Sequence, residues 1–146
     1  MLDLALALVH HILVFGLVAL LAMEGLILKD ATLDPARLVR IDGRYGLVAG
    51  LVVAVGACRV IWGGKGWAFY EANPFFWGKV GLFLILGLVS IGPTLLFIRW
   101  RRASAGAALF TPPAAELKRA RTGIGLEALL MVPLLACAAA MARYPF

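Results

Sequence analysis

The stretch VHHILVFGLVALLAMEGLIL, residues 9–28, decides the fold of this chain. It contains one acidic residue and neither lysine nor arginine. A helix rises about 1.5 Å per residue, so a stretch of this length reaches across a hydrocarbon core of about 30 Å. Inside a bilayer the backbone must satisfy its own hydrogen bonds, which favours a helix over a strand. We therefore predict a membrane-spanning helix over residues 4–28.

Three further apolar segments, residues 45–63, 75–99 and 122–142, are long enough to cross a bilayer. Apolar residues make up 63% of the 146-residue chain, against about 45 to 50% in soluble domains. The start, MLDLAL, has no basic residue, and the first segment is longer than a signal-peptide core, so we expect it to be retained. The sequence predicts an all-α integral membrane four-helix bundle, a single transmembrane domain over residues 1–146.

Lysine and arginine gather in the first and third loops, and only Lys65 and Arg143 lie in the opposite connections. Positive loops remain cytoplasmic, so we expect both termini on the non-cytoplasmic side of a bacterial inner membrane. The net charge of +6 is thereby explained by orientation, and we expect no nucleic-acid binding. The basic residues of the two loops are Lys29, Arg37, Arg40, Arg44, Arg99, Arg101, Arg102, Lys118, Arg119 and Arg121.

Aromatic residues are concentrated around the second loop and the start of the third span. Tryptophan and tyrosine are enriched where a protein meets the membrane interface. We therefore predict an aromatic belt at the outer interface, formed by Trp62, Trp67, Tyr70, Phe75, Phe76 and Trp77.

Four polar residues in three different spans are predicted at a similar depth below the outer surface: His10, His11, Arg59 and Lys79. Two imidazoles and two cations suit an anionic amphiphile or a metalloporphyrin with its propionates. Adjacent helical residues project about 100° apart, so both histidines cannot ligate one metal from the same face. The alternative is a hydrogen-bonded structural histidine, with Lys79 and Arg59 extending to the outer headgroups.

Two carboxyl groups, those of Glu24 and Glu127, lie towards the cytoplasmic side of the predicted spans. Glu127 either pairs with Arg44 or Arg121 to close the bundle or is protonated and relays protons. Of these two roles, the ion pair is the more common one for a buried carboxylate.

Small residues recur within the spans, as in Gly46 with Gly50 and Gly123 with Gly125. Such residues allow helices to approach closely, so we expect a homo-oligomer or a subunit of a larger membrane complex. Cys58 and Cys137 stand singly in apolar runs without CxxC spacing, which gives no sign of a redox motif. Ser90 and Thr94 suit hydrogen bonds between helices.

Several long stretches resemble the bacterial membrane proteins known as domain of unknown function 2214. They are VHHILVFGLVALLAMEGLIL, ARLVRIDGRYGLVAGLVV, RVIWGGKGWAFYEANPFFWGKVGLFL and SIGPTLLFIRW. The resemblance covers nearly the whole chain and implies a membrane bundle, but that family name carries no function.

The order of features is also similar to the HemJ-type protoporphyrinogen oxidases, which are small haem-binding membrane bundles. The similarity lies in the first-helix histidines, in Trp77 with Lys79, in the RWRR stretch, and in the segment from Arg121 through Glu127. It implies haem b and oxidation of a tetrapyrrole. Gly92 and Pro93 stand where a further histidine is expected. Copper-resistance D-type membrane proteins have a similar layout, but their metal role needs more His or Met ligands.

These observations leave three hypotheses for function. In the first, His11, or alternatively His10, ligates the haem iron, and Arg59 and Lys79 neutralise the propionates or steer an anionic substrate. Quinone or a tetrapyrrole is the expected reaction partner, and Lys79, Arg59 and Glu127 are the candidate catalytic residues. The second hypothesis is a non-catalytic accessory or assembly subunit, and the third is a small transporter.

Overall fold

The computed structural model describes residues 1–144, and the elements of this part of the chain are helices. Four of them are long and apolar enough to cross a membrane, which confirms the predicted fold class. A fifth, short helix precedes the third span and was not predicted. The helices are α1 (Leu2–Ile27), α2 (Pro35–Trp62), α3 (Gly66–Glu71), α4 (Pro74–Ala103) and α5 (Ala114–Arg143).

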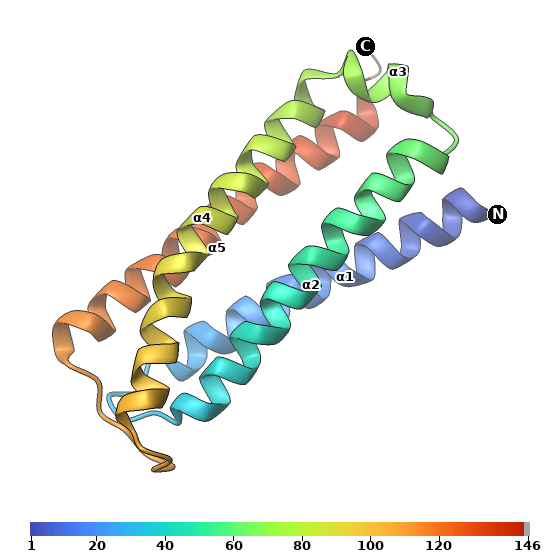
Figure 1. Ribbon diagram of the computed structural model, residues 1–146. Coiled ribbons are helices and arrows are strands. Elements are labelled where there is room, and N and C mark those ends of the chain that lie inside the picture. Colours follow the sequence, from blue (N-terminus) through green and yellow to red (C-terminus); the bar gives the residue numbers. More distant parts are fainter. Residues whose placement is uncertain (145–146) are drawn as a thin grey trace.

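The long helices are arranged as two antiparallel pairs, α1 with α2 and α4 with α5 (Figure 1). The α1–α2 and α4–α5 connections lie together at one end, which we call the basic-loop end. The first residues of α1, the last residues of α5 and the short helix α3 lie at the other, which we call the aromatic end (Figure 1). The two pairs are joined by contacts of α2 with α4 and of α1 with α5.

Two helices begin well before the apolar segments that predicted them. Helix α2 starts at Pro35 rather than at residue 45, and α5 starts at Ala114 rather than at residue 122. The Asp34 carboxylate accepts hydrogen bonds from the backbone N–H groups of Ala36 and Arg37, and proline is favoured at the first helical position. Hydropathy marks only the part of a helix within hydrocarbon, so it missed these charged first turns.

The two loops at the basic-loop end are bound to each other. Leu33 and Phe110 exchange two backbone hydrogen bonds of 2.9 Å, and the Thr32 and Thr111 hydroxyls are 3.1 Å apart. Arg121 on α5 adds a further connection. Its guanidinium donates to the carbonyl oxygens of Leu28, Lys29 and Asp30, just beyond the last residue of α1. A cation at this position also complements the negative end of the helix dipole.

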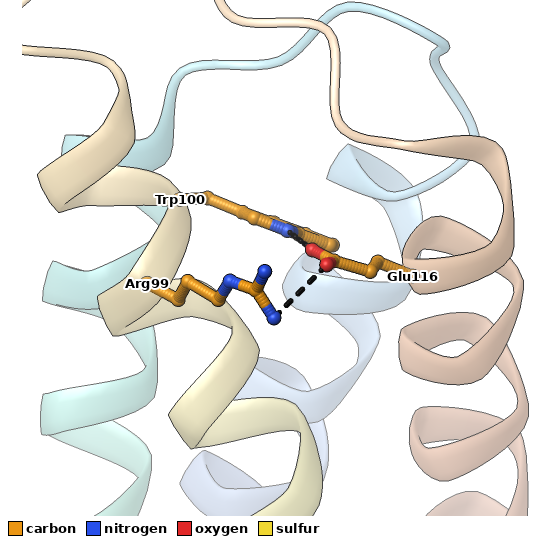
Figure 2. Close-up of polar contacts among 3 residues, drawn as sticks. All are labelled: Arg99, Trp100 and Glu116. Carbon is orange, nitrogen blue, oxygen red and sulfur yellow. Dashed lines mark hydrogen bonds and ion pairs between the residues drawn. The ribbon is translucent and has the colours of Figure 1, made fainter.

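Glu116 holds α4 and α5 together close to their connection. Its carboxylate accepts a 2.8 Å hydrogen bond from the indole N–H of Trp100 and lies 3.1 Å from the Arg99 guanidinium (Figure 2). Trp100 is only 1% exposed, whereas the Arg99 side chain is 71% exposed. The bond to the buried indole therefore contributes more to stability than the solvated ion pair.

The apolar core lies mainly in the half of the bundle next to the basic-loop end. Its members are Leu17, Leu21, Leu28, Leu33, Leu38, Tyr45, Leu86, Phe97, Trp100, Leu117, Ala120, Ile124 and Met131. Helix α1 has no buried residue before Leu17, and α4 has none before Leu86.

Helices α4 and α5 are in close contact where Pro93 faces Gly123. A Cβ atom added to Gly123 would lie 2.6 Å from the Pro93 ring. We call the half of the bundle next to the basic-loop end the packed half. Its packing requires glycine at position 123.

Candidate functional site

His10 is the histidine that points into the bundle. Its ring lies against α2, where a Cβ atom added to Gly56 would be 3.5 Å from the imidazole Cε1 atom. The ring Nδ1 atom is buried and has no hydrogen-bond partner. The Val52 backbone of α2 also interacts with the His10 ring, and the Nδ1 atom is the ring nitrogen that stays unpaired and available to a ligand.

His11 lies on the exposed side of α1. Its Nδ1–H group donates a 2.6 Å hydrogen bond to the Ala7 carbonyl one turn earlier, and the two imidazole centroids are 6.3 Å apart. The sequence favoured His11 for the role inside the bundle. The structure instead gives the inward position to His10, because residue 10 lies on the face of α1 that packs against α2.

Arg59 of α2 and Lys79 of α4 lie close enough to His10 for their charges to act on its ring. Both side chains are half-buried, and the Arg59 Nε atom is buried without a hydrogen-bond partner. Within residues 1–144, the one ion pair is that of Arg99 with Glu116. Neither Arg59 nor Lys79 therefore forms an ion pair with an acidic residue of this part of the chain. Three of the four residues predicted to share a depth thus converge on one place.

A second polar cluster lies in the packed half and contains three carboxyl groups from three helices: Glu24 of α1, Asp42 of α2 and Glu127 of α5. Glu24 and Glu127 are each 1% exposed. Glu24 lies within electrostatic range of the carboxyl groups of Asp42 and Glu127. Tyr45 of α2 faces Glu127, and Thr94 of α4 donates a 2.8 Å hydrogen bond to Asp42. We call these five residues the acidic cluster.

The predicted ion pair of Glu127 is wrong. Both of its carboxylate oxygens are buried without a hydrogen-bond partner, and no arginine or lysine of the described chain lies within ion-pair distance. Arg44 is exposed on α2, and the Arg121 guanidinium is occupied by the carbonyl groups after α1. Because α5 begins at Ala114, Glu127 lies about 20 Å along the helix, deeper than the sequence indicated.

Tyr45 was missed by the sequence analysis, and Asp42 was not recognised as part of a buried site. Both belong to the buried face of α2 that also carries Leu38 and Ile41, at helical spacing. The start signal at Asp34 and Pro35 would have placed them well inside the helix. Thr94 bonds across to α2 as predicted, whereas Ser90 donates to the Gly87 carbonyl of its own helix.

The two clusters are far apart and opposite in charge. His10 and Glu24 are 14 positions apart on α1, which corresponds to about 21 Å along the helix. Leu17 and Leu21 are buried between them. The polar residues therefore form two sites with an aliphatic layer between them, and not a continuous polar path.

Aromatic side chains surround the end of the bundle that carries His10, Arg59 and Lys79. Trp67 makes edge contacts with Phe76 and Trp77, and Tyr70 contacts Phe76. Trp67 and Trp77 are half-exposed, as expected of residues that meet an interface. Cys58 and Cys137 are free thiols.

Four apolar spans with interior polar clusters define a small multi-pass α-helical membrane protein. The chain belongs to the family described as Predicted membrane protein (DUF2214), whose model matches residues 2–144. No curated protein and no solved structure is similar enough to the chain to count as a match.

Proposed function

We propose that this protein binds haem b at the aromatic end and is a redox protein of the bacterial inner membrane. The observation that carries the proposal is the unpaired, buried Nδ1 atom of His10 beside two cations without acidic partners. An imidazole can ligate the haem iron, and two cations suit its two propionates.

The residues present fit a porphyrin better than a bare metal ion. Among residues 1–144 no three His, Cys, Asp or Glu side chains converge as a metal site. A metal at His10 would therefore need most of its ligands from elsewhere, and a porphyrin provides four. When bound, the haem would supply one-electron redox chemistry, which the side chains of this chain do not offer.

Each residue of the cluster has a distinct role in this proposal. His10 would ligate the iron, and Gly56 leaves space for the imidazole against α2. Arg59 and Lys79 would bind the propionates or orient an anionic substrate such as a tetrapyrrole. Quinone is the proposed electron acceptor, since it shares the bilayer. His11 lies outside this set and serves as the matched control.

The arrangement of basic residues supports a specific orientation in the membrane. The ten lysines and arginines assigned to the first and third loops all belong to the basic-loop end. By the positive-inside rule this end is cytoplasmic, and the haem site faces the outer leaflet. A cysteine introduced at Ala107 should then react with an impermeant maleimide only after the membrane is opened, and one introduced at Gly64 before it.

The visible absorption spectrum of the detergent-purified protein tests the function. We expect a Soret band that shifts on reduction with dithionite, is lost in His10→Ala and is kept in His11→Ala. A colourless protein from haem-sufficient cells would contradict the proposal. It would favour the accessory or assembly subunit, for which the exposed Gly46 and Gly50 on α2 offer a close-approach surface.

A further inference from the structure

Among the residues that the structure describes, no lysine or arginine forms an ion pair with the acidic cluster. Glu24, Asp42 and Glu127 project from α1, α2 and α5. Helix α4 contributes the hydroxyl groups of Ser90 and Thr94. One oxygen of Glu24 and both oxygens of Glu127 are buried and unpaired. Charged carboxylates in such a place are strongly unfavourable, so the cluster must hold protons or bind a cation.

The Tyr45 hydroxyl is a further unsatisfied polar group of the acidic cluster. Tyr45 is 4% exposed, and its hydroxyl is buried without a hydrogen-bond partner. It faces the Glu127 carboxyl group without meeting the geometry of a hydrogen bond. Buried hydroxyls almost always have a partner, and an orphaned group next to unpaired carboxyls suggests a polar guest.

A pocket between α2 and α4 adjoins the cluster and has a volume of about 250 Å³. Asp42, Tyr45 and Thr94 belong to both the pocket and the cluster, and Phe83 joins Thr94 in the wall on α4. The volume lies below the range of about 300 to 1,000 Å³ usual for ligand sites, so a guest must be small. The Phe83 ring offers an aromatic surface of the kind that binds cations.

A metal ion does not suit this place. Among the described residues, no three His, Cys, Asp or Glu side chains are arranged to hold a metal ion, and this includes the acidic side chains of the cluster. A small organic cation needs no fixed coordination geometry, and its apolar body matches the largely apolar wall of the pocket.

We propose that the pocket between α2 and α4 binds a small organic cation, whose charge is held by Asp42 in exchange for a proton from the acidic cluster. A cation bound to a neutral cluster would leave an uncompensated charge in the membrane interior. Binding therefore converts one carboxyl group to a carboxylate and releases its proton. The titratable groups that share this proton are Glu24, Asp42, Tyr45 and Glu127.

This inference does not depend on haem. The two clusters lie about 21 Å apart along α1, so either proposal can fail while the other stands.

Calorimetry with benzyltrimethylammonium tests the inference, because this cation cannot itself release a proton. Titrations of the purified protein in two buffers with different ionisation enthalpies count the protons released. We expect saturable binding with release of about one proton per bound cation near neutral pH. Neopentylbenzene, its uncharged carbon analogue, should release none.

Asp42→Asn should weaken the binding of this cation by about 30-fold or more, since it removes the carboxylate that meets the charge. Tyr45→Phe keeps the ring and removes only the hydroxyl, so it tests the site if Asp42→Asn does not fold. It should also weaken binding. Asp3→Asn, an exposed acid at the other end of α1, should not. Absence of binding up to about 10 mM, binding without proton release, or wild-type affinity in both variants would overturn the inference.

Discussion

The two halves of the bundle differ in how they treat polar residues. In the packed half, Glu24 and Glu127 are fully buried, and an apolar core surrounds them. We call the half next to the aromatic end the aromatic half. Its residues His10, Arg59 and Lys79 are only partly buried. The parts of α1 and α4 that carry His10 and Lys79 have no buried residue. The helix pairs also lie farther apart towards this end (Figure 1).

The difference separates stability from ligand binding. Tight packing around Trp100, Pro93 and Gly123 holds the helices together, and the pocket in this half is small. Helices α1 and α4 bury no residue in the aromatic half, so its polar side chains can reorganise around a larger amphiphilic ligand. We therefore expect substitutions in the apolar core of the packed half to change mainly the free energy of unfolding, and those at His10, Arg59 or Lys79 to change mainly the affinity for haem.

The largest effect should come from removing Arg59 and Lys79, the two cations beside His10. The double variant Arg59→Gln, Lys79→Gln should lower the affinity for ferric haem about 100-fold, because a hydrogen bond to a charged group contributes about 1.5 kcal/mol or more. Spectrophotometric titration measures the loss. Lys65→Gln, at the same end but with its ammonium over the Phe69 ring, should bind as the wild type does. Equal losses in both would mean that only the net charge matters.

Packing in the other half is tested by Gly123→Ala. The added methyl group would meet the Pro93 ring at 2.6 Å, and a proline ring within a helix cannot move aside. We expect the free energy of unfolding to fall by about 1 to 3 kcal/mol. Gly125→Ala is the matched control, since nothing lies within 4 Å of its Cβ position. Thermal unfolding in detergent compares the two, and equal stability would show that the helices are not in close contact.

Glu116 separates a buried hydrogen bond from an exposed ion pair. Glu116→Ala leaves the Trp100 indole N–H without its acceptor and should lower the free energy of unfolding by about 1 kcal/mol or more. Glu116→Gln keeps an acceptor oxygen and should recover most of that loss. Arg99→Gln should cost less than about 1 kcal/mol, because its side chain is solvated. A larger loss for Arg99→Gln than for Glu116→Ala would reverse this assignment.

The smallest effect on stability is expected at Glu127. Removing one partner of a buried ion pair costs about 3 to 5 kcal/mol, whereas Glu127 has no such partner. Glu127→Gln should therefore change the free energy of unfolding by less than about 1 kcal/mol. Chemical denaturation in mixed micelles measures this value, and a loss of several kcal/mol would restore the ion-pair interpretation.

The sequence predicted the membrane spans because hydropathy alone determines them. It misplaced the beginnings of α2 and α5 because charged turns continue a helix beyond the hydrocarbon. Asp34 and Pro35 are a recognisable start signal, but Pro113 gives α5 no side-chain cap. Helix α3 depends on aromatic contacts made by Trp67 and Tyr70, which spacing does not reveal.

The two candidate sites were predictable to different degrees. Residues at a common depth, such as His10, Arg59 and Lys79, are found by counting positions from the ends of the spans. The direction in which a side chain points depends on how the helices pack, so His10 could not be distinguished from His11. Predicting the acidic cluster would have required the correct first residue of α2. It would also have required knowing that Arg121 bonds to the carbonyl groups after α1 and not to Glu127.

The separation of the two halves is tested most directly by titrating ferric haem into the purified protein and its His10→Ala and Asp42→Asn variants. Our account predicts that His10→Ala abolishes the Soret shift of the bound haem, and that Asp42→Asn leaves the affinity unchanged. Wild-type binding by His10→Ala, or equal losses in both variants, would contradict it.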